Sequence, residues 1–351
     1  MGHVARWRTP TKSGGSTSLS LVLATYNGEQ FLPELLSSLA GQTRAPDELI
    51  IVDDGSSDDT LDMIDDFARW APFKVRLLER RAHLGTWATF EDGLRAAKGE
   101  IIAICDQDDR WHPDKLAVMV ARMRQNPDAL MAFSDARLIN AAGVQIGRSR
   151  WRVAGFSPRQ SRQATEDPFA TLLTRQAVSG CTTAIRAELL DVILPFPEDV
   201  HPGLPTMMYD RWISLVAAAA APVVTIPEKL VDYRIHPGQQ MGIPALRLRR
   251  VAPRAALHAA QLVHNRMEHQ RRSDYYAAHL DLIDKRLSVS RFGSDEAADR
   301  LEAATRHLNA RSSLQTGRRA RARQVATEFR RPDGYRRYSL GVASALGDVT
   351  R

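Results

Sequence analysis

Five apolar stretches rich in β-branched residues are spaced along the first 140 positions of the chain. Stretches of this length predict buried strands, and the intervals between them carry apolar residues three and four positions apart, which predicts helices. Right-handed crossovers then give an α/β fold, with a mainly parallel sheet flanked by helices and any ligand at the carboxyl ends of the strands. The five stretches are LSLVLAT (19–25), ELIIVDD (48–54), KVRLLE (74–79), EIIAICD (100–106) and LMAFSDA (130–136).

Polar residues follow three of these predicted strands at their carboxyl ends. A buried carboxylate is costly unless it is paired or binds a metal, so acids that converge at one sheet edge indicate a ligand pocket rather than a core. Among metals, carboxylate oxygens favour Mg²⁺ or Mn²⁺. The polar residues are Thr25, Tyr26 and Asn27 after the first strand, Asp53 and Asp54 after the second, and Asp106, Asp108 and Asp109 after the fourth.

The two common phosphate-binding loops are missing from the sequence. No Gly-x-Gly-x-x-Gly follows a strand, and no Gly-x-x-x-x-Gly-Lys-Ser occurs. This disfavours dinucleotide dehydrogenases and P-loop enzymes. A second way to bind a nucleotide remains, in which carboxylates hold the base and ribose and a divalent ion neutralises the diphosphate.

Composition narrows the class of protein. The 351 residues are 44% hydrophobic, which is ample for a globular protein of one or two lobes. The longest apolar run, 213–224, is too short to span a membrane and contains Pro222. Residues 1–17 are basic without an apolar stretch behind them, so we expect a flexible leader and cytoplasmic chemistry. Cys105 and Cys181 are the two cysteines, which indicates neither a disulfide framework nor a cysteine metal site.

Residues 245–351 are predicted to form a separate basic α-helical region, with a break near 242–244. The formal net charge is +7, and much of the excess lies at 247–254 and 318–323. Such segments suit an anionic membrane surface or form a solvated face, while the apolar stripes need a partner, either the α/β part or another subunit. Nucleic acid is the least favoured partner because interleaved aromatics are lacking. The helical patterns cover 255–270, 275–287 and 294–308.

The motifs within residues 18–240 resemble those of the family 2 glycosyltransferases of the GT-A fold. LSLVLATYNGEQFLPELLSSLAGQTRAPDELIIVDDGSSDDT is similar to the opening of that family, and AKGEIIAICDQDDRWHPDKL to its DXD region. AspGlnAspAsp and TyrAspArgTrp further resemble the rhamnosyltransferase-like members. The resemblance implies a GT-A catalytic domain over 18–242, with a nucleotide-sugar half at 18–140 and an acceptor half at 141–242.

The resemblance also implies roles for individual residues in the first half. Asp54 is expected to contact the base, Asp106 the ribose, and Asp108 a Mg²⁺ or Mn²⁺ ion on the diphosphate. Gly85 is expected either to let the backbone approach the nucleotide or to form the turn that opens a helix. Asp109 is expected either to tune the site or to cap the next helix. The implied nucleotide-sugar residues are Thr25, Tyr26, Asn27, Asp54, Gly85, Asp106, Gly180 and Arg234.

Residues of the second half are expected to handle the acceptor. Asp210 is implied to be the base that takes the proton of an acceptor hydroxyl, the alternative being a helix cap. His236 is implied to complete the metal shell or to make a structural hydrogen bond, and Arg234 to meet the departing diphosphate. The sequence departs from the family pattern at Thr89, where relatives often carry Asn, and at Gln239 in the loop after the last motif.

The function that follows is inverting, metal-dependent transfer of a sugar, with rhamnose among the expected sugars. The donor is a nucleoside-diphosphate sugar, linked to dTDP or UDP, and the acceptor is a hydroxyl of a cell-surface glycan or a lipid-linked glycan. The basic helices would attach the enzyme to the inner face of the membrane or form a homo-oligomer. The rival is a non-catalytic GT-A-like scaffold that binds through its basic tail; intact acids at 54, 106, 108 and 210 argue against it.

Overall fold

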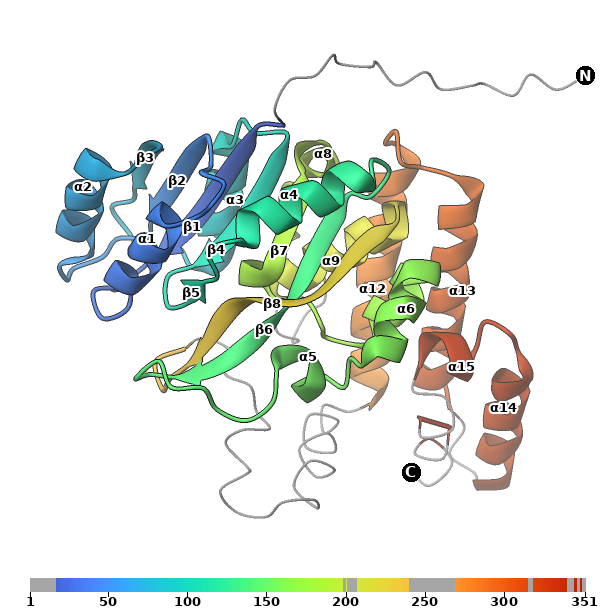
Figure 1. Ribbon diagram of the computed structural model, residues 1–351. Helices are drawn as coiled ribbons and strands as arrows, with labels where there is room; N and C mark the ends of the chain where they lie inside the picture. Colours follow the sequence, from blue (N-terminus) through green and yellow to red (C-terminus); the bar gives the residue numbers. More distant parts are fainter. Residues whose placement is uncertain are drawn as a thin grey trace, which may run out of the picture.

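The computed structural model describes residues 17–197, 200, 207–239, 269–314, 318–339, 344, 345 and 348. One mixed sheet runs through the α/β part (Figure 1). Its strands are β1 (Leu19–Thr25), β2 (Glu48–Asp53), β3 (Lys74–Glu79), β4 (Ile101–Asp106), β5 (Arg110–Trp111), β6 (Met131–Asn140), β7 (Thr183–Arg186) and β8 (Val223–Ile235).

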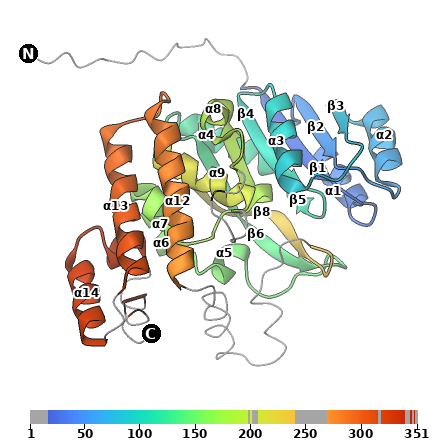
Figure 2. The ribbon, with the colours of Figure 1, turned by 180° about the vertical axis from the view of Figure 1, so that it is seen from behind.

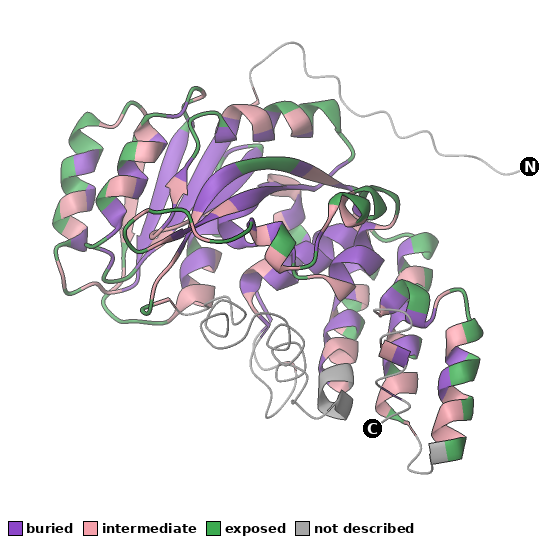
Figure 3. Ribbon diagram, turned by 60° about the horizontal axis from the view of Figure 1, so that its bottom comes forward, coloured by how far each residue is buried: buried purple, intermediate pink, exposed green. Residues whose placement is uncertain are grey.

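The order of strands in this sheet is β3-β2-β1-β4-β7-β6-β8-β5. The first four in this order are parallel, as predicted, whereas β7 runs antiparallel to both of its neighbours and β5 is antiparallel to β8. All five predicted strands form, and the α/β class is confirmed. The central strands are buried (Figure 3), which explains why they read as continuous apolar runs rather than alternating ones.

Helices cover both faces of the sheet and form two apolar clusters. One cluster joins β1, β2 and β4 to α1, α2 and α4, and the other joins the opposite face to α3, α7 and α9. The elements between the strands are α1 (Leu32–Ala40), α2 (Thr60–Trp70), α3 (Thr86–Ala96), α4 (Lys115–Gln125), α5 (Arg150–Val153), α6 (Pro158–Glu166), α7 (Pro168–Thr174), η1 (Gly180–Thr182), η2 (Ala187–Leu189), α8 (Leu190–Ile193) and α9 (Tyr209–Ala220).

The C-terminal helices pack directly on the α/β part (Figure 2). Arg286 lies over the ring of Trp212 in α9 and donates hydrogen bonds to the carbonyls of Val192 and Ile193. The apolar stripes of the first two C-terminal helices therefore have the α/β part as their partner, which settles for these helices a choice that the sequence left open. The helices are α12 (His269–Ser288), α13 (Asp295–Ser312), α14 (Arg318–Arg330) and α15 (Tyr335–Tyr338).

Other parts of the predicted organisation fall outside what the structure describes. Three predicted segments lie outside the described residues. They are the leader apart from Thr17, the break near 242–244, and nearly all of the helix predicted at 255–270. Within the described part of the chain, no helix combines the length and the apolarity needed to cross a membrane. β6 and β8, which lie on either side of the predicted division at residue 140, pair along ten positions. The assignment of a nucleotide-sugar half and an acceptor half stays a prediction.

Candidate active site

The carboxyl ends of β2, β1 and β4 lie side by side and are tied together by polar side chains. In the parallel register Thr25 is paired with Asp53, and its hydroxyl donates to the Asp53 carboxylate over 2.8 Å. On the other side, Gln107 makes two hydrogen bonds to the backbone of Tyr26, at 2.9 and 3.0 Å. The three predicted polar clusters thus share one edge of the sheet.

Asp53 organises the loop that follows β2 rather than facing the edge. It is fully buried, and its carboxylate accepts hydrogen bonds from the backbone N–H groups of Gly55 and Ser56 and from the Ser56 hydroxyl. Asn27 approaches the same loop with a φ of 45°, a left-handed conformation that Asn tolerates better than most residues, and its side chain accepts from the N–H of Ser57. Asn27 therefore binds the neighbouring loop in this structure.

Asp54 is the acid that the edge surrounds with donors. Its side chain is only 3% exposed, yet its carboxylate accepts three hydrogen bonds. Oδ1 accepts from the Leu84 N–H (2.9 Å) and from Arg80 (3.2 Å), and Oδ2 accepts from the Gly85 N–H (2.7 Å). His83 Nδ1 lies 2.9 Å from Oδ2, so protein groups surround both carboxylate oxygens.

Gly85 is the N-cap of helix α3, and its backbone conformation explains why glycine stands at this position. Its φ is 90°, in the region that favours glycine, and a Cβ atom there would meet no described atom within 4 Å. The turn that opens the helix is what the structure shows, and the predicted close approach of a nucleotide stays a prediction. Thr89, which stands where relatives often carry Asn, caps the same turn by donating its hydroxyl to the Gly85 carbonyl over 2.8 Å.

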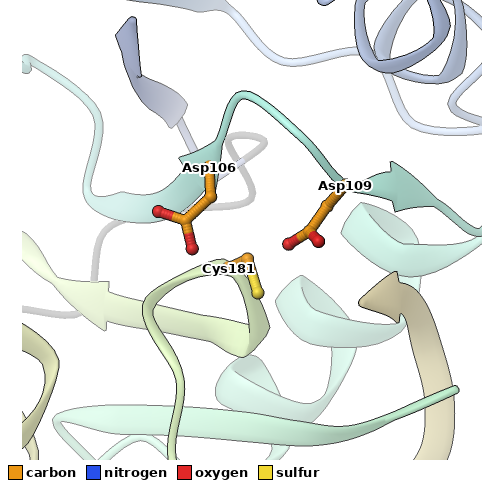
Figure 4. Close-up of side chains that lie close together, drawn as sticks. All are labelled: Asp106, Asp109 and Cys181. Carbon is orange, nitrogen blue, oxygen red and sulfur yellow. The ribbon is translucent and has the colours of Figure 1, made fainter. Parts of the chain in front are cut away.

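Asp106 and Asp109 lie on either side of Cys181 (Figure 4). One ligand atom from each of the three residues fits within a cluster whose members all lie within 4.8 Å of one another. Burial, followed by the negative charges of Asp108 and Asp210, raises the pKa of Asp106 to about 7. Burial, followed by the negative charges of Asp108 and Asp106, holds the pKa of Asp109 well above its usual range. Carboxyl groups are therefore crowded at this edge of the sheet, and they repel one another when all are ionised. We call the edge formed by Asp106, Asp108 and Asp109 the acidic edge.

The structure decides between the two roles expected for Asp109. Its Oδ1 accepts the Arg234 backbone N–H at 2.9 Å, and its Oδ2 is buried with no hydrogen-bond partner among the described residues. The residue at the N-cap of α4 is Asp114, so Asp109 does not cap that helix. Asp109 belongs to the acidic edge.

Asp108 contacts the residues that follow β8. Its Oδ2 lies 3.0 Å from His236 Nε2 and accepts from Gln239 at 3.2 Å. Both side chains of the Asp108–His236 pair are partly accessible, at 17% and 16% exposed. The structure thus brings together the two residues predicted to hold the metal, and Gln239 occupies the third position around the same oxygen.

Asp210 lies at the start of α9, next to Tyr209, whose side chain contacts the acidic edge. The Tyr209 hydroxyl donates to Asp106 over 3.2 Å, and the ring fits because residue 180 is glycine: a Cβ atom there would lie 1.9 Å from the Tyr209 oxygen. The Gly180 N–H and the Arg211 N–H are hydrogen-bonded to the Asp210 carboxylate. Burial outweighs these contacts and raises the pKa of Asp210, which makes it a stronger base.

Comparisons with known proteins agree with this geometry. The profile of the family described as Glycosyl transferase family 2 matches residues 20–194. An uncharacterized protein of Mycobacterium tuberculosis is 29% identical over 220 residues, which cover 62% of this chain and 59% of that protein. The glucosyltransferase WfgD of Escherichia coli is 30% identical over 122 residues, covering 35% of this chain and 47% of WfgD.

The matched segment, residues 20–194, is a glycosyl transferase family 2 domain. The crystal structure of TarS residues 1–349 from Staphylococcus aureus superposes with a TM-score of 0.54 at 18% identity, over 89% of this chain and 80% of that one. This likeness confirms the GT-A fold with its helical C-terminal region. The match to the Mycobacterium relative spans less than two thirds of that protein's length.

Two buried arginines near the acidic edge have their guanidinium groups bound by protein acceptors. Arg234 is 1% exposed, and its guanidinium donates to the carbonyls of Asp108 and Ala141 and to the Glu34 carboxylate. Arg211 donates to the last carbonyls of α7, including that of Leu173 at 2.8 Å, as a basic side chain does at a helix C-terminus. In this structure protein acceptors engage both guanidinium groups, and the role of Arg234 at a diphosphate stays a prediction.

The residues at the acidic edge fit a divalent cation. Asp109 carries a buried oxygen without a hydrogen-bond partner among the described residues, and Asp106 offers a second carboxylate in the same cluster. The charge of Asp108 acts on both, so it adds a third carboxylate at this edge. The Cys181 thiol is a poor ligand for such an ion, because a hard divalent cation prefers oxygen donors. The oxygen donors therefore favour Mg²⁺ or Mn²⁺ over a thiophilic metal.

Four residues that hold this site were given no role there from the sequence. Each contacts a residue at least 66 positions away, so no local pattern shows its role, although Gln107, Lys115 and Tyr209 lie inside the quoted motifs. Lys115, for example, is fully buried over the Trp111 ring, and burial lowers its pKa to about 8. Its ammonium donates to the Cys181 carbonyl at 2.6 Å and so fixes η1. The four are Gln107, Lys115, Cys181 and Tyr209.

Proposed function

We propose that the chain is an inverting, metal-dependent glycosyltransferase that moves a sugar from a nucleoside diphosphate to a hydroxyl of an acceptor. The observation that carries the proposal is the coupling of Asp210 to Asp106. Tyr209 donates to Asp106, and the charge of Asp210 is among the causes that raise the pKa of Asp106. The candidate base thus lies on the same acidic edge as the residues expected to bind the donor.

In this reaction Asp210 takes the proton of the acceptor hydroxyl while that oxygen attacks the anomeric carbon from the face opposite the leaving diphosphate. The raised pKa suits Asp210 to the task, since a base works best when its pKa lies near the working pH. The Gly180 N–H orients the carboxylate. A divalent ion, when bound, supplies positive charge to the leaving group, and Asp108 and His236 are the residues that we propose hold it.

The relatives support a pyrimidine nucleotide and a glycan acceptor. WfgD is named for transfer from UDP-Glc to a GlcNAc-diphosphoundecaprenol, and TarS for transfer of N-acetylglucosamine to poly(ribitol-phosphate). We propose a UDP- or dTDP-linked donor for this chain and a cell-surface glycan or its lipid-linked precursor as the acceptor. Rhamnose stays among the proposed sugars on the basis of the sequence motifs.

The C-terminal helices supply a basic surface that suits attachment to an anionic bilayer at the inner face of the membrane. Each basic residue near such a surface contributes about 1 kcal/mol, so several together hold a protein there. Self-association through this region is the competing proposal. Co-sedimentation with vesicles that contain or lack acidic lipid, beside light scattering on the full chain, separates the two. Exposed arginines of α14, α15 and the connection between them are Arg319, Arg323, Arg330, Arg331, Arg336 and Arg337.

The experiment that tests the proposed reaction is a donor panel with UDP-glucose, UDP-N-acetylglucosamine and dTDP-rhamnose. Release of the nucleoside diphosphate is measured with lipid-linked and glycan acceptors, with Mg²⁺, with Mn²⁺ and with a chelator. We expect release with one class of donor, dependent on metal and absent in Asp210→Asn. Asp65→Asn, an exposed acid on α2, is the matched control that keeps activity. Nucleotide binding without release from any donor would favour the scaffold.

A further inference from the structure

His83 makes both of the contacts that a nucleotide base would make at the Asp54 pocket. Its ring lies 4.0 Å from that of Tyr26, centroid to centroid, at an interplanar angle of 33°. Its Nδ1 lies 2.9 Å from Asp54 Oδ2.

A uracil or thymine base has the same two features. Its π face stacks on aromatic side chains, and its N3–H can donate to a carboxylate. Tyr26 and Asp54 are the residues expected to supply the platform and the acceptor. Asp54 already accepts three hydrogen bonds, and His83 Nδ1 lies 2.9 Å from its Oδ2, so a base can reach that oxygen only when a neighbouring group moves away.

The group that can move away most easily is His83. Two of the others are backbone N–H groups at the start of α3, and the third belongs to Arg80, whose side chain is 12% exposed and also bound to Asp92. The His83 side chain is 45% exposed, and Asp54 and Tyr26 are its recorded partners. Rotation of this one side chain frees both a lone pair of Asp54 and a face of Tyr26.

We propose that His83 is a stand-in for the base: it occupies the base position in the donor-free protein and competes with the nucleotide for Asp54 and Tyr26. This inference rests on the proposed function, since it takes the pocket to be that of a nucleoside-diphosphate donor. It has a definite consequence for affinity. A protein whose binding-competent state is only partly populated binds more weakly by that fraction, so removing the competitor strengthens binding.

The test is calorimetric titration of UDP, with Mg²⁺ present, into the wild type, His83→Ala and His83→Phe. We expect His83→Ala to bind UDP about three- to tenfold more tightly, because the competitor is lost. His83→Phe keeps a ring against Tyr26 but loses the polar contact of Nδ1 with Asp54, so its affinity should fall between the two. Ribose 5-phosphate, which has no base, should bind all three proteins equally. His112→Ala, at a histidine 46% exposed outside the pocket, is the matched control.

Other outcomes separate this inference from the proposed function. Equal or weaker binding of UDP by His83→Ala, with an unchanged melting temperature, would overturn the stand-in role while leaving the donor pocket in place. A gain shared by ribose 5-phosphate would also overturn it, since the effect would not concern the base. A wild type that binds neither UDP nor dTDP would refute the proposed function and the stand-in role together.

Discussion

The acidic edge and the C-terminal helices both bury ionisable groups, but they treat them in opposite ways. At the edge, Asp106 and Asp109 lie against other acids, and one oxygen of Asp109 has no described partner. In the helices, His307 lies between Glu328 Oε1 at 2.8 Å and Ser339 Oγ at 2.7 Å. Asp348 accepts from Arg311 and Tyr335 in the same layer, at 2.8 and 2.6 Å.

This difference distinguishes a functional site from a purely structural core. A buried network whose members are all paired fixes one packing arrangement and has nothing to bind, whereas clustered like charges are unfavourable until a ligand neutralises them. The folded protein tolerates repulsion at the edge because that edge is where a cation and a diphosphate would be accommodated. Substitutions at the acidic edge should therefore change catalysis, and substitutions in the C-terminal helices should change stability.

The largest expected effect is on transfer in Asp210→Asn. The amide keeps the size of the carboxylate but cannot take a proton, so we expect turnover at saturating donor to fall by about 10²- to 10⁴-fold. UDP affinity should stay within about twofold, because Asp210 takes part in the acceptor step. Rapid-quench measurement of transfer, beside titration of UDP, checks both. A variant that turns over normally but binds UDP poorly would move Asp210 to a binding role.

The next effect is a loss of metal-dependent turnover in Asp108→Asn. The change removes a ligand charge without removing volume, and we expect turnover to fall by about 10²- to 10³-fold with the fold intact. The Mn²⁺ concentration that gives half-maximal activity should rise in parallel. Asp114→Asn, which alters an acid at the N-cap of α4, is the control for charge alone. An unchanged Mn²⁺ dependence in Asp108→Asn would remove Asp108 from the metal site.

A smaller effect, and one of a different kind, is expected from Glu328→Ala. The change leaves His307 Nδ1 buried without its partner, so the free energy of unfolding should fall by about 1–3 kcal/mol. Affinity for UDP and the rate of transfer per folded molecule should not change. Urea unfolding measures the first and the donor assay the second, with the exposed Glu302→Ala on α13 as the matched control. Loss of transfer without loss of stability would place the helices in the chemistry.

How much of this could be read from the sequence depends on whether a feature is local. The strands were predicted because a buried parallel strand is a continuous apolar run, and β1 and β3 match the expected ranges residue for residue. The acids at the strand ends were predicted because they directly follow these apolar runs in the sequence. Gln107 was not, since its bonds to Tyr26 become visible only once β1 and β4 are known to be neighbours.

Arg234 also shows what a local sequence pattern leaves undetermined. Its motif indicated a residue that meets phosphate, and His236, two positions on, does contact Asp108. Whether the guanidinium points to a ligand or into the protein depends on Glu34 in α1 and on the carbonyl of Asp108, which the local pattern does not contain. Side-chain direction at a strand end is thus set by distant segments.

The last and smallest effect concerns pH, and it has opposite signs in the two regions. Burial lowers the pKa of His307 below the reference value of 6.5, so the unfolded chain binds more protons just below that pH. The stability from neutral His307 is present above pH 6.5 and is lost as the pH falls through the folded pKa. Asp106 behaves in the reverse way: its pKa is raised from 3.8 to about 7, so its contribution falls as the pH rises through that interval.

Each proton contributes at most about 1.4 kcal/mol per pH unit, so the net slope of stability against pH is small, but two variants resolve it. His307→Gln keeps polar contacts without titrating and should make the slope just below pH 6.5 more negative than in the wild type. Asp106→Asn should make it more positive. Urea unfolding at closely spaced pH values measures both slopes. If the two variants shifted the slope in the same direction, the contrast between a neutral, paired helical layer and a mutually repelling acidic edge would be wrong.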